Sequence, residues 1–172
     1  MSETSLSEMN DLTYLRAAIA EARLAELAGE VPIGAIIVHQ NEIIARGQNR
    51  VLRDHDPTAH AEIVALRQAG RALENYRLSQ EDGGCTLYTT LEPCAMCAGA
   101  ILHARIARLV YAAPDPKAGA CGSVLAVMNH PQLNHKVEVT SGLLADECGA
   151  LLTNFFLKRR GKKLLAAEES ER

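Results

Sequence analysis

The sequence predicts one α/β domain in which helices cover both faces of a central sheet. Short apolar runs that are typical of strands alternate along the chain with longer segments of helical periodicity, and the pattern shows no internal repeat. No linker-like segment divides the 172 residues, and 48% of them are hydrophobic, which is enough to bury one core. Because aromatic residues make up only 3% of the chain, that core must be mainly aliphatic.

The first half of the chain predicts a helix, a hairpin and a second helix. The expected elements are a helix over residues 12–29, a strand over 33–38, a second strand over 43–45 and a helix that follows Pro57. The first helix is inferred from Leu12, Leu15 and Ile19, whose spacing places them on the same face of a helix. The strand over 33–38 is continuously apolar, as in a strand buried on both faces, and the polar break after it indicates a hairpin.

The second half alternates strands and helices in the same way. Its expected elements are a surface loop over 79–84, a strand over 85–90, a helix opened by Pro93, strands over 106–112 and 137–139, and a terminal helix from Leu144. The loop is inferred from its polar and glycine-rich composition, and Pro93 suits the first turn of a helix. In the last segment Cys148, Leu151 and Phe155 are three and four residues apart, which places them on one helix face.

Composition and charge restrict the classes of function. The formal net charge is −3, so a basic surface for nucleic acid would have to be local. No apolar run approaches the roughly 20 residues that cross a bilayer, and the polar, acidic start is unlike a signal peptide. We therefore expect a cytoplasmic protein without membrane association. Five cysteines are an odd number, which fits metal binding or burial better than disulfides.

Two short segments carry the chemistry: His60-Ala61-Glu62 and Pro93-Cys94-Ala95-Met96-Cys97. Each stands at the start of an expected helix, directly after a loop. A helix N-terminus carries partial positive charge, which lowers the pKa of a cysteine and favours the thiolate that zinc binds. Cys94 and Cys97 are three residues apart, so they lie close together on one turn and can hold a single ion. With His60 they offer three protein ligands and leave a fourth position open, as in catalytic zinc sites.

Glu62 is the expected proton carrier. Two thiolates offset the charge of Zn²⁺, and a water activated in such a site has a pKa lowered toward about 7. Hydroxide can then form at neutral pH, provided that a nearby group takes up the proton and passes it on. Glu62 lies two residues from His60 and is the obvious general acid and base.

Each half of this motif has an ordinary explanation when it is taken alone. A Cys-x-x-Cys pair is more often a redox motif or half of a structural zinc site, and a His-x-Glu pair occurs often by chance. A structural zinc module that binds RNA would need a fourth protein ligand, for which Cys121 and His103 are the candidates. A thiol redox protein would need neither His60 nor Glu62. In combination, with Pro93 before the first cysteine, the pattern H-x-E…P-C-x-x-C is the known signature of zinc-dependent nucleobase deaminases.

Beyond this motif the chain resembles the bacterial tRNA-specific adenosine deaminases, which have the cytidine deaminase-like fold. The matching blocks are residues 30–35, 49–50, 55–62, 91–94, 97–100, 115–119, 134–135 and 144–148. The resemblance implies a three-layer α/β/α sandwich around a mixed sheet of about five strands. We accordingly expect a disordered tail over 1–10, a single deaminase domain over 11–163 and a polar tail over 164–172.

The resemblance also assigns roles to the matching residues. His60, Cys94 and Cys97 would hold one Zn²⁺ per subunit, and Glu62 would shuttle protons. The amide of Asn49 would bind the adenine edge. The resemblance also implies further substrate contacts, in the base pocket and with the RNA around the flipped nucleotide. The residues that would make them are Val31, Ala61, Asp115, Lys117 and Asn134. The implied reaction is attack of metal-activated hydroxide on carbon 6 of adenine, with loss of ammonia and formation of inosine.

The substrate that the resemblance implies is the wobble adenosine of a tRNA anticodon loop, whose unpaired bases can be splayed into a pocket at low cost. It implies a homodimer as well, with the tRNA touching both subunits, and no nucleotide cofactor. The terminal helix gives an independent indication of RNA, because it clusters five cations over 155–163 in an acidic chain. In that segment Phe156 and Arg159 would contact the substrate.

Two alternatives remain open at this point. Positive charge near a helix C-terminus also stabilises the helix dipole, so the cations over 155–163 do not by themselves require RNA. A deaminase of free guanine, cytosine or a related nucleoside would use the same zinc motif and would not need this basic segment.

Overall fold

The computed structural model describes residues 3–79, 83–128 and 130–170, and within these ranges the side chains from residue 7 to residue 161. In this part the chain forms four helices and five strands. Their bounds are α1 Glu3–Leu27, β1 Gly34–His39, β2 Glu42–Gln48, α2 Ala61–Ala72, β3 Thr86–Leu91, α3 Ala95–His103, β4 Arg108–Ala113, β5 Glu138–Ser141 and α4 Ala145–Ser170. No helix of the described ranges is both long and apolar enough to cross a membrane.

The five strands form one mixed sheet in the order β2-β1-β3-β4-β5. β1 pairs antiparallel with β2 and β3, whereas β3, β4 and β5 run parallel to one another. Val110 of β4 lies opposite Tyr88 on one side and Thr140 on the other. Central strands are covered on both faces, which explains why β1 and β4 are almost entirely buried. The mixed sheet of five strands that the resemblance implied is confirmed.

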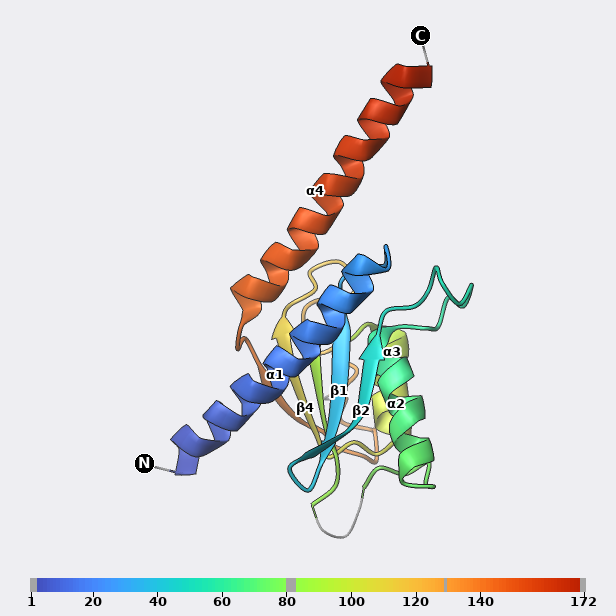
Figure 1. Cartoon of the computed structure of the whole chain (residues 1–172). Coiled ribbons are helices and arrows are strands. Elements are labelled where there is room, and N and C mark those ends of the chain that lie inside the picture. Colours follow the sequence, from blue (N-terminus) through green and yellow to red (C-terminus); the bar gives the residue numbers. More distant parts are fainter. Residues whose placement is uncertain (1–2, 80–82, 129, 171–172) are drawn as a thin grey trace.

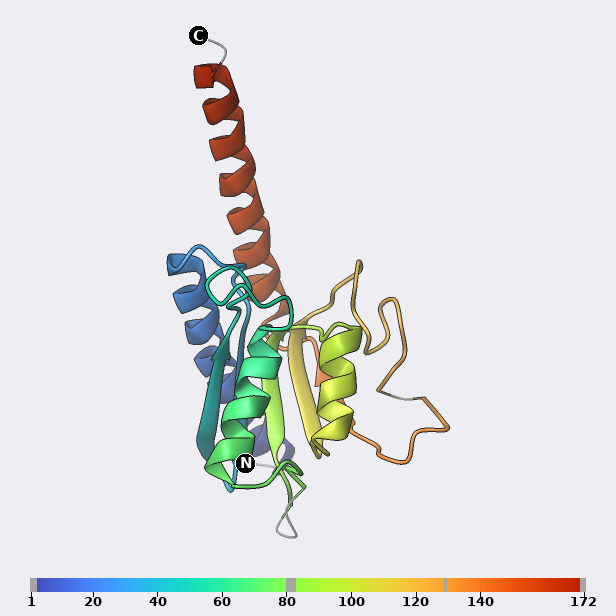
Figure 2. The same cartoon turned by 90° about the vertical axis from the view of Figure 1, so that its right-hand side faces the viewer.

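Helices cover both faces of this sheet (Figures 1 and 2). On one face α2 and α3 pack against Ile37, Leu87 and Leu109 in one buried cluster. On the other face α1 and the start of α4 pack against the intervening residues, such as Ile36 and Val110. Successive side chains of a strand point to opposite faces, so a single sheet serves two cores. The expected three-layer α/β/α sandwich is therefore present.

The edge strand β2 is longer than its apolar run predicted. It covers seven residues, from Glu42 to Gln48, although only 43–45 were expected. An edge strand is exposed on one side, and polar residues at both of its ends do not interrupt its pairing with β1. The apolar run therefore covers only the centre of the strand.

The terminal helices also reach further than expected. α1 begins at Glu3 and α4 continues to Ser170, so helix extends into the ranges 1–10 and 164–172, which were expected to be tails. No proline interrupts either segment, which removes the strongest helix breaker. The division of the chain into a domain and two tails stays a prediction. The centre of the expected loop over 79–84, residues 80–82, lies outside the described residues.

Candidate metal centre and substrate cavity

Three potential metal ligands converge where α2 and α3 begin. His60 immediately precedes α2 and Cys94 immediately precedes α3, while Cys97 lies in the first turn of α3. Their ligand atoms all lie within 4.8 Å of one another. Neither Cys121 nor His103, the two candidates for a fourth protein ligand, joins this group in the described part of the chain. The arrangement therefore offers three protein ligands and leaves further positions to other molecules.

Close packing of β2 against α2 holds His60 in place. A Cβ atom at Gly47 would overlap the carbonyl oxygen of Ala61, so a larger residue would push the strand away from the helix. After β2, the amide of Arg50 donates to the carbonyl of Ala59 at 2.9 Å. Ala61 itself is completely buried in the core, backbone and side chain alike, so its expected contact with substrate stays a prediction.

The spacing of the donor atoms fits a tetrahedral metal. Nδ1 of His60 lies 3.7 Å from Sγ of Cys94 and 3.6 Å from Sγ of Cys97. With Zn–S bonds of about 2.3 Å and Zn–N bonds of about 2.05 Å at tetrahedral angles, nitrogen and sulfur would be roughly 3.6 Å apart. One imidazole and two thiolates are also ligands that suit zinc. The residues present therefore fit this ion in geometry and in chemistry.

The cluster favours a thiolate at Cys94. Hydrogen bonds with Cys97 and His60 lower the pKa of Cys94 to about 3. The same contact with Cys94, together with burial, raises the pKa of the Cys97 thiol. The interaction with Cys94 also raises the pKa of His60. At neutral pH the group therefore already carries a negative sulfur that can bind a cation.

Glu62 places a carboxyl group beside the ligands. It lies in the first turn of α2, is 4% exposed and forms a hydrogen bond with the Cys97 thiol. Burial raises the pKa of this carboxyl group. An acid whose pKa is raised toward neutrality accepts and releases protons readily, which is the property of a general acid and base.

Asn49 is held by a buried glutamate. Its side-chain amide nitrogen donates to Glu30 at 3.3 Å, so the carboxylate sets the orientation of the amide group. Glu30 is completely buried and also accepts from the backbone amides of Leu52 and Arg53, at 3.2 Å and 2.7 Å. The turn that follows β2 is thereby fixed next to the start of α2.

A cavity of about 700 Å³ gathers four of the residues expected to contact substrate. Among the residues that line it are Val31, Asp115, Lys117, Phe156 and Arg160. The Asp115 carboxylate accepts from the backbone amide of Lys117 at 2.9 Å and so also caps its own turn. Leu91, three residues before Cys94, lies in the same wall. The cavity therefore reaches the segment that leads to Cys94, while His60, Cys94 and Cys97 themselves do not line it.

The other four expected contacts do not line this cavity: Asn49 and Ala61, described above, and Asn134 and Arg159. Asn134 is exposed and accepts a hydrogen bond from Arg105 at 3.0 Å, beyond the C-terminal end of α3. The potential ligands Cys94 and Cys97 lie at the other end of α3, which spans nine residues or about 13 Å. Arg159 packs over the ring of Phe155, at 6.0 Å from its centre, while its neighbour Arg160 lines the cavity. A role in substrate binding stays a prediction for all four residues.

Glu30, Glu92 and Arg160 were not singled out from the sequence, although each has a defined place around the centre. The two glutamates stand in blocks that resemble the deaminases, and both are buried, at 0% and 2% exposure. A charged residue directly at the end of an apolar strand was the signal that could have identified Glu92, because such a side chain needs polar partners inside the fold.

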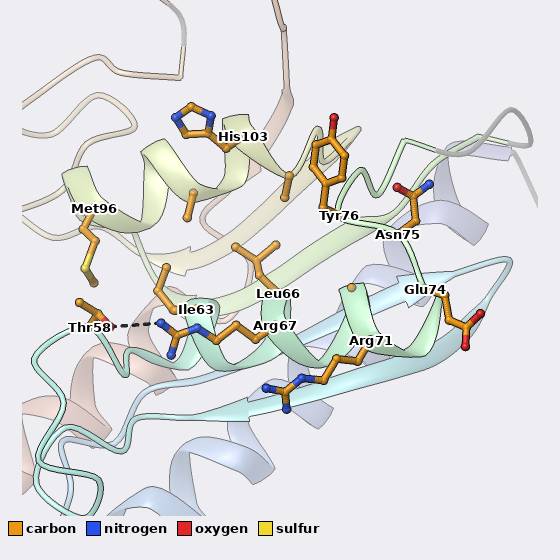
Figure 3. A pocket seen from close by; sticks show the side chains of 13 residues that line it. Thr58, Ile63, Leu66, Arg67, Arg71, Glu74, Asn75, Tyr76, Met96 and His103 are labelled. Atoms are coloured by element: carbon orange, nitrogen blue, oxygen red, sulfur yellow. Dashed lines mark hydrogen bonds between the residues drawn. The ribbon is translucent and has the colours of Figure 1, made fainter.

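A second groove, of about 650 Å³, lies between α2 and α3 on the outside of the sandwich (Figure 3). Ile63 and Leu66 of α2 and Met96 of α3 form part of its walls. Met96 stands between the two cysteines in the sequence and is 36% exposed, and Tyr76, at the edge of the groove, is 72% exposed. α3, which carries the potential ligand Cys97, thus presents an apolar surface on its outer side.

Comparison with known proteins identifies relatives along most of the chain. The family model of the MafB19-like deaminases matches residues 9–160. The tRNA-specific adenosine deaminase of Haemophilus influenzae is 50% identical over 154 residues, which cover 89% of this chain and 87% of the relative. The tRNA-specific adenosine deaminase of Bacillus subtilis is 45% identical over 156 residues, which cover 91% of this chain and 94% of the relative.

Solved structures give the same result. A structure from studies of A-to-I editing by tRNA:A34 deaminases at the wobble position of transfer RNA matches with a TM-score of 0.76 and 46% identity, covering 81% of this chain and 99% of that chain. A guanine deaminase from Nitrosomonas europaea matches with a TM-score of 0.70 and 29% identity, over 84% of this chain and 83% of that chain. The family that the sequence resembled is thereby confirmed: the chain belongs to the MafB19-like deaminases and, among them, to the tRNA-specific adenosine deaminases.

Proposed function

We propose that this chain converts adenosine to inosine in RNA and that its substrate is the wobble adenosine of a tRNA anticodon loop. The observation that carries this proposal is the position of Glu62, a buried carboxyl group in contact with a ligand of the three-residue metal group. The relatives named tRNA-specific adenosine deaminases and the likeness to a tRNA:A34 deaminase structure support the same substrate.

The resident metal that we propose is one zinc ion per chain, held by Nδ1 of His60 and the Sγ atoms of Cys94 and Cys97. The separation of these donor atoms supports this choice, as does the thiolate that Cys94 forms at neutral pH. When bound, zinc lowers the pKa of a water molecule and so supplies hydroxide at neutral pH.

Glu62 carries two protons in the proposed reaction. Its carboxylate takes one from water and delivers it to N1 of adenine while a bond forms between the water oxygen and carbon 6. It then transfers the remaining proton of that oxygen to the 6-amino group, the bond between carbon 6 and this nitrogen breaks, and ammonia leaves. Adenosine and water thus become inosine and ammonia, and Glu62 regains its starting charge.

Asn49 is the proposed reader of the adenine edge. An amide group offers a carbonyl oxygen and two N–H groups. Glu30 accepts one of these N–H groups, so turning the amide over would break this bond and face the carbonyl oxygen against the carboxylate. The fixed amide presents a donor and an acceptor side by side, which is the combination that adenine pairs with.

We further propose that two copies of the chain associate and that the protein acts in the cytoplasm, as the resemblance implies. The groove between α2 and α3 is the surface assigned to the association, because Met96 and Tyr76 are exposed along it (Figure 3). Sedimentation equilibrium is expected to give the mass of a dimer for the wild type and of a monomer for Tyr76→Asp. A monomeric wild type would contradict this assembly.

A deaminase of free guanine is the second candidate, because a guanine deaminase shares the fold at 29% identity. The exposed cations Lys158, Arg159 and Arg160 of α4 weigh against it, since a small neutral base has no phosphates for them to neutralise.

The test is to incubate zinc-loaded protein with an anticodon stem-loop that contains a wobble adenosine and, in parallel, with free adenosine, cytidine and guanine. We expect inosine from the stem-loop alone and no product after chelation of the metal. Turnover of guanine but not of the stem-loop would establish the second candidate. Metal binding without turnover of any anticodon loop or free base would instead favour a structural zinc module.

A further inference from the structure

One buried carboxylate organises the loop that follows β4. Glu92, the residue after β3, is 2% exposed. Its Oε2 accepts from the amide of Asp115 at 3.0 Å, and its Oε1 accepts from the amides of Cys121 and Ser123 at 2.9 Å and 3.1 Å. The hydroxyl group of Ser123 is a fourth donor, to Oε2. All four donors are uncharged and belong to the same loop.

The loop is packed so closely around Glu92 that position 119 has no room for a side chain. A Cβ atom at Gly119 would overlap the carboxylate of Glu92 and would lie 2.6 Å from the carbonyl oxygen of Asp115. The carboxylate therefore lies inside the loop, in the space that a larger residue at 119 would need. This packing is a second observation, separate from the hydrogen bonds, that ties the loop to Glu92.

The same loop is joined to the segment that carries the metal ligands. The amide of Ala120 donates to the carbonyl of Pro93 at 2.8 Å, and Gly119 forms an isolated β-bridge with Cys94. Asp115 and Lys117, at the start of the loop, line the cavity beside the centre. The loop that Glu92 binds is thus linked to Cys94 and also contributes to the wall of the candidate substrate cavity.

We propose that Glu92 is a positioning residue for the substrate, which holds Asp115 and Lys117 at a fixed place relative to Cys94. Turns and isolated bridges make up the described part of this loop, so the part-buried amides of Asp115, Cys121 and Ser123 depend on an acceptor from outside it. A carboxylate has about four acceptor positions and no donor, which matches the four donors that it meets. In Glu92→Gln, the side-chain NH₂ group would face the N–H donors of the loop and could not accept hydrogen bonds from them.

The kinetic test compares Glu92→Gln and Ser123→Ala with Asp11→Asn as a matched control. Asp11 is also a buried acceptor, but it bonds to Tyr88 and Arg108 on the opposite face of the sheet. For the anticodon stem-loop we expect KM to rise about tenfold in Glu92→Gln and less in Ser123→Ala, with a smaller change in kcat and no loss of bound zinc. Asp11→Asn should lower the Tm and leave KM unchanged.

Hydrogen–deuterium exchange supplies a readout that does not depend on activity. In Glu92→Gln we expect the amides of Asp115, Cys121 and Ser123 to exchange at least about tenfold faster. The amide of Val64 in α2, which donates to the carbonyl of His60, should keep its rate. A role in overall stability alone would accelerate both sets of amides and leave KM unchanged.

Three results would overturn the proposal. The first is unchanged exchange of the loop amides in Glu92→Gln. The second is partial loss of bound zinc with a lower kcat and an unchanged KM, which would mean that Glu92 acts on Cys94. The third applies if Glu92→Gln does not fold. It is a Ser123→Ala protein in which both KM and the exchange rate of the Cys121 amide equal those of the wild type. Only the KM measurement rests on the proposed function, because it requires that the protein deaminate the stem-loop. A wild type that fails to deaminate the stem-loop would refute that function, whereas exchange would still decide whether Glu92 fixes the loop.

Discussion

The ligand-bearing ends of α2 and α3 contrast with the second half of α4. At the metal centre Cys97 is completely buried and Glu62 is 4% exposed, and the thiols, the imidazole and the carboxyl group contact one another. Along α4, Phe156 is 45% and Leu157 is 53% exposed, and the helix runs away from the sandwich (Figure 1). One region is closed and packed, and the other is open to solvent.

The contrast suggests that the buried cluster performs the chemistry and that the exposed part of α4 attracts the substrate. Charges in a water-poor site interact strongly and need no rearrangement during the reaction, so the buried cluster suits bond breaking. Charges on an exposed helix are screened by salt within about 10 Å, but several together can attract a polyanion. Changes in the cluster should therefore abolish turnover, whereas changes on α4 should alter affinity by degrees.

Removal of a ligand should have the largest effect. Cys94→Ala leaves two protein ligands, so we expect the bound zinc to be lost and inosine formation to fall to the uncatalysed level, by at least about 10⁶-fold. Metal analysis and an inosine assay on the same preparation measure both quantities, and circular dichroism checks that the protein is folded. A folded Cys94→Ala protein that deaminates without metal would refute the metal centre.

Removal of the proton carrier should come next. Glu62→Gln keeps the shape of the side chain but cannot carry a proton, so kcat for the stem-loop should fall by about 10²–10⁴-fold while zinc stays bound. KM should change little, because the amide still fills the same space. Wild-type kcat in this variant would show that another group moves the protons.

The opposite face of the sheet offers a charge cluster that should govern stability and not chemistry. Arg108 donates to both oxygens of Asp11 at 2.7 Å, and the hydroxyl group of Tyr88 donates to the same carboxylate at 2.8 Å. Burial raises the pKa of Asp11, but the hydrogen bonds and the charge of Arg108 outweigh it and hold the pKa below its ordinary value of 3.8.

A carboxyl group whose pKa is lowered on folding stabilises the protein above its ordinary pKa, and this contribution is lost as the pH falls through the lowered value. Asp11→Asn should therefore reduce the free energy of unfolding by roughly 1–3 kcal/mol at neutral pH. The difference from the wild type should shrink below pH 3.8. Denaturant titrations at neutral and acidic pH measure it, and kcat at neutral pH should not change. A difference that grows on acidification would contradict this assignment.

Two neighbouring arginines of α4 should show the smallest effects and can refine the comparison. Arg160 lines the candidate substrate cavity, whereas Arg159 packs over Phe155. We expect Arg160→Ala to raise KM a few-fold and to reduce the slope of log affinity against log salt by about one, with kcat unchanged. Arg159→Ala should do less. Equal effects of the two substitutions, measured across a salt series, would argue against the cavity as the RNA-binding surface.

The closeness of Cys94 to Cys97 and of Glu62 to His60 could be predicted from the sequence because each depends on local spacing. One turn of α3 is enough to bring Cys94 and Cys97 together, and Glu62 needs only to stand two residues after His60 at a helix start. The order of strands and helices was predictable for a related reason, since apolar periodicity reflects which residues face a core. The polar ends of β2 lay beyond that signal.

Only the tertiary structure decided which distant residues meet around the centre. Glu92 bonds to Asp115 and Ser123, which are 23 and 31 residues away, and the sequence contains no pattern that relates these positions. The structure likewise places Arg160 rather than Arg159 in the cavity wall and Asn134 at the far end of α3. A motif within one helix carries its own geometry. A contact between segments that follow different strands instead depends on how β3 and β4 pair in the sheet. That pairing is fixed only when the whole sheet and both of its cores are assembled.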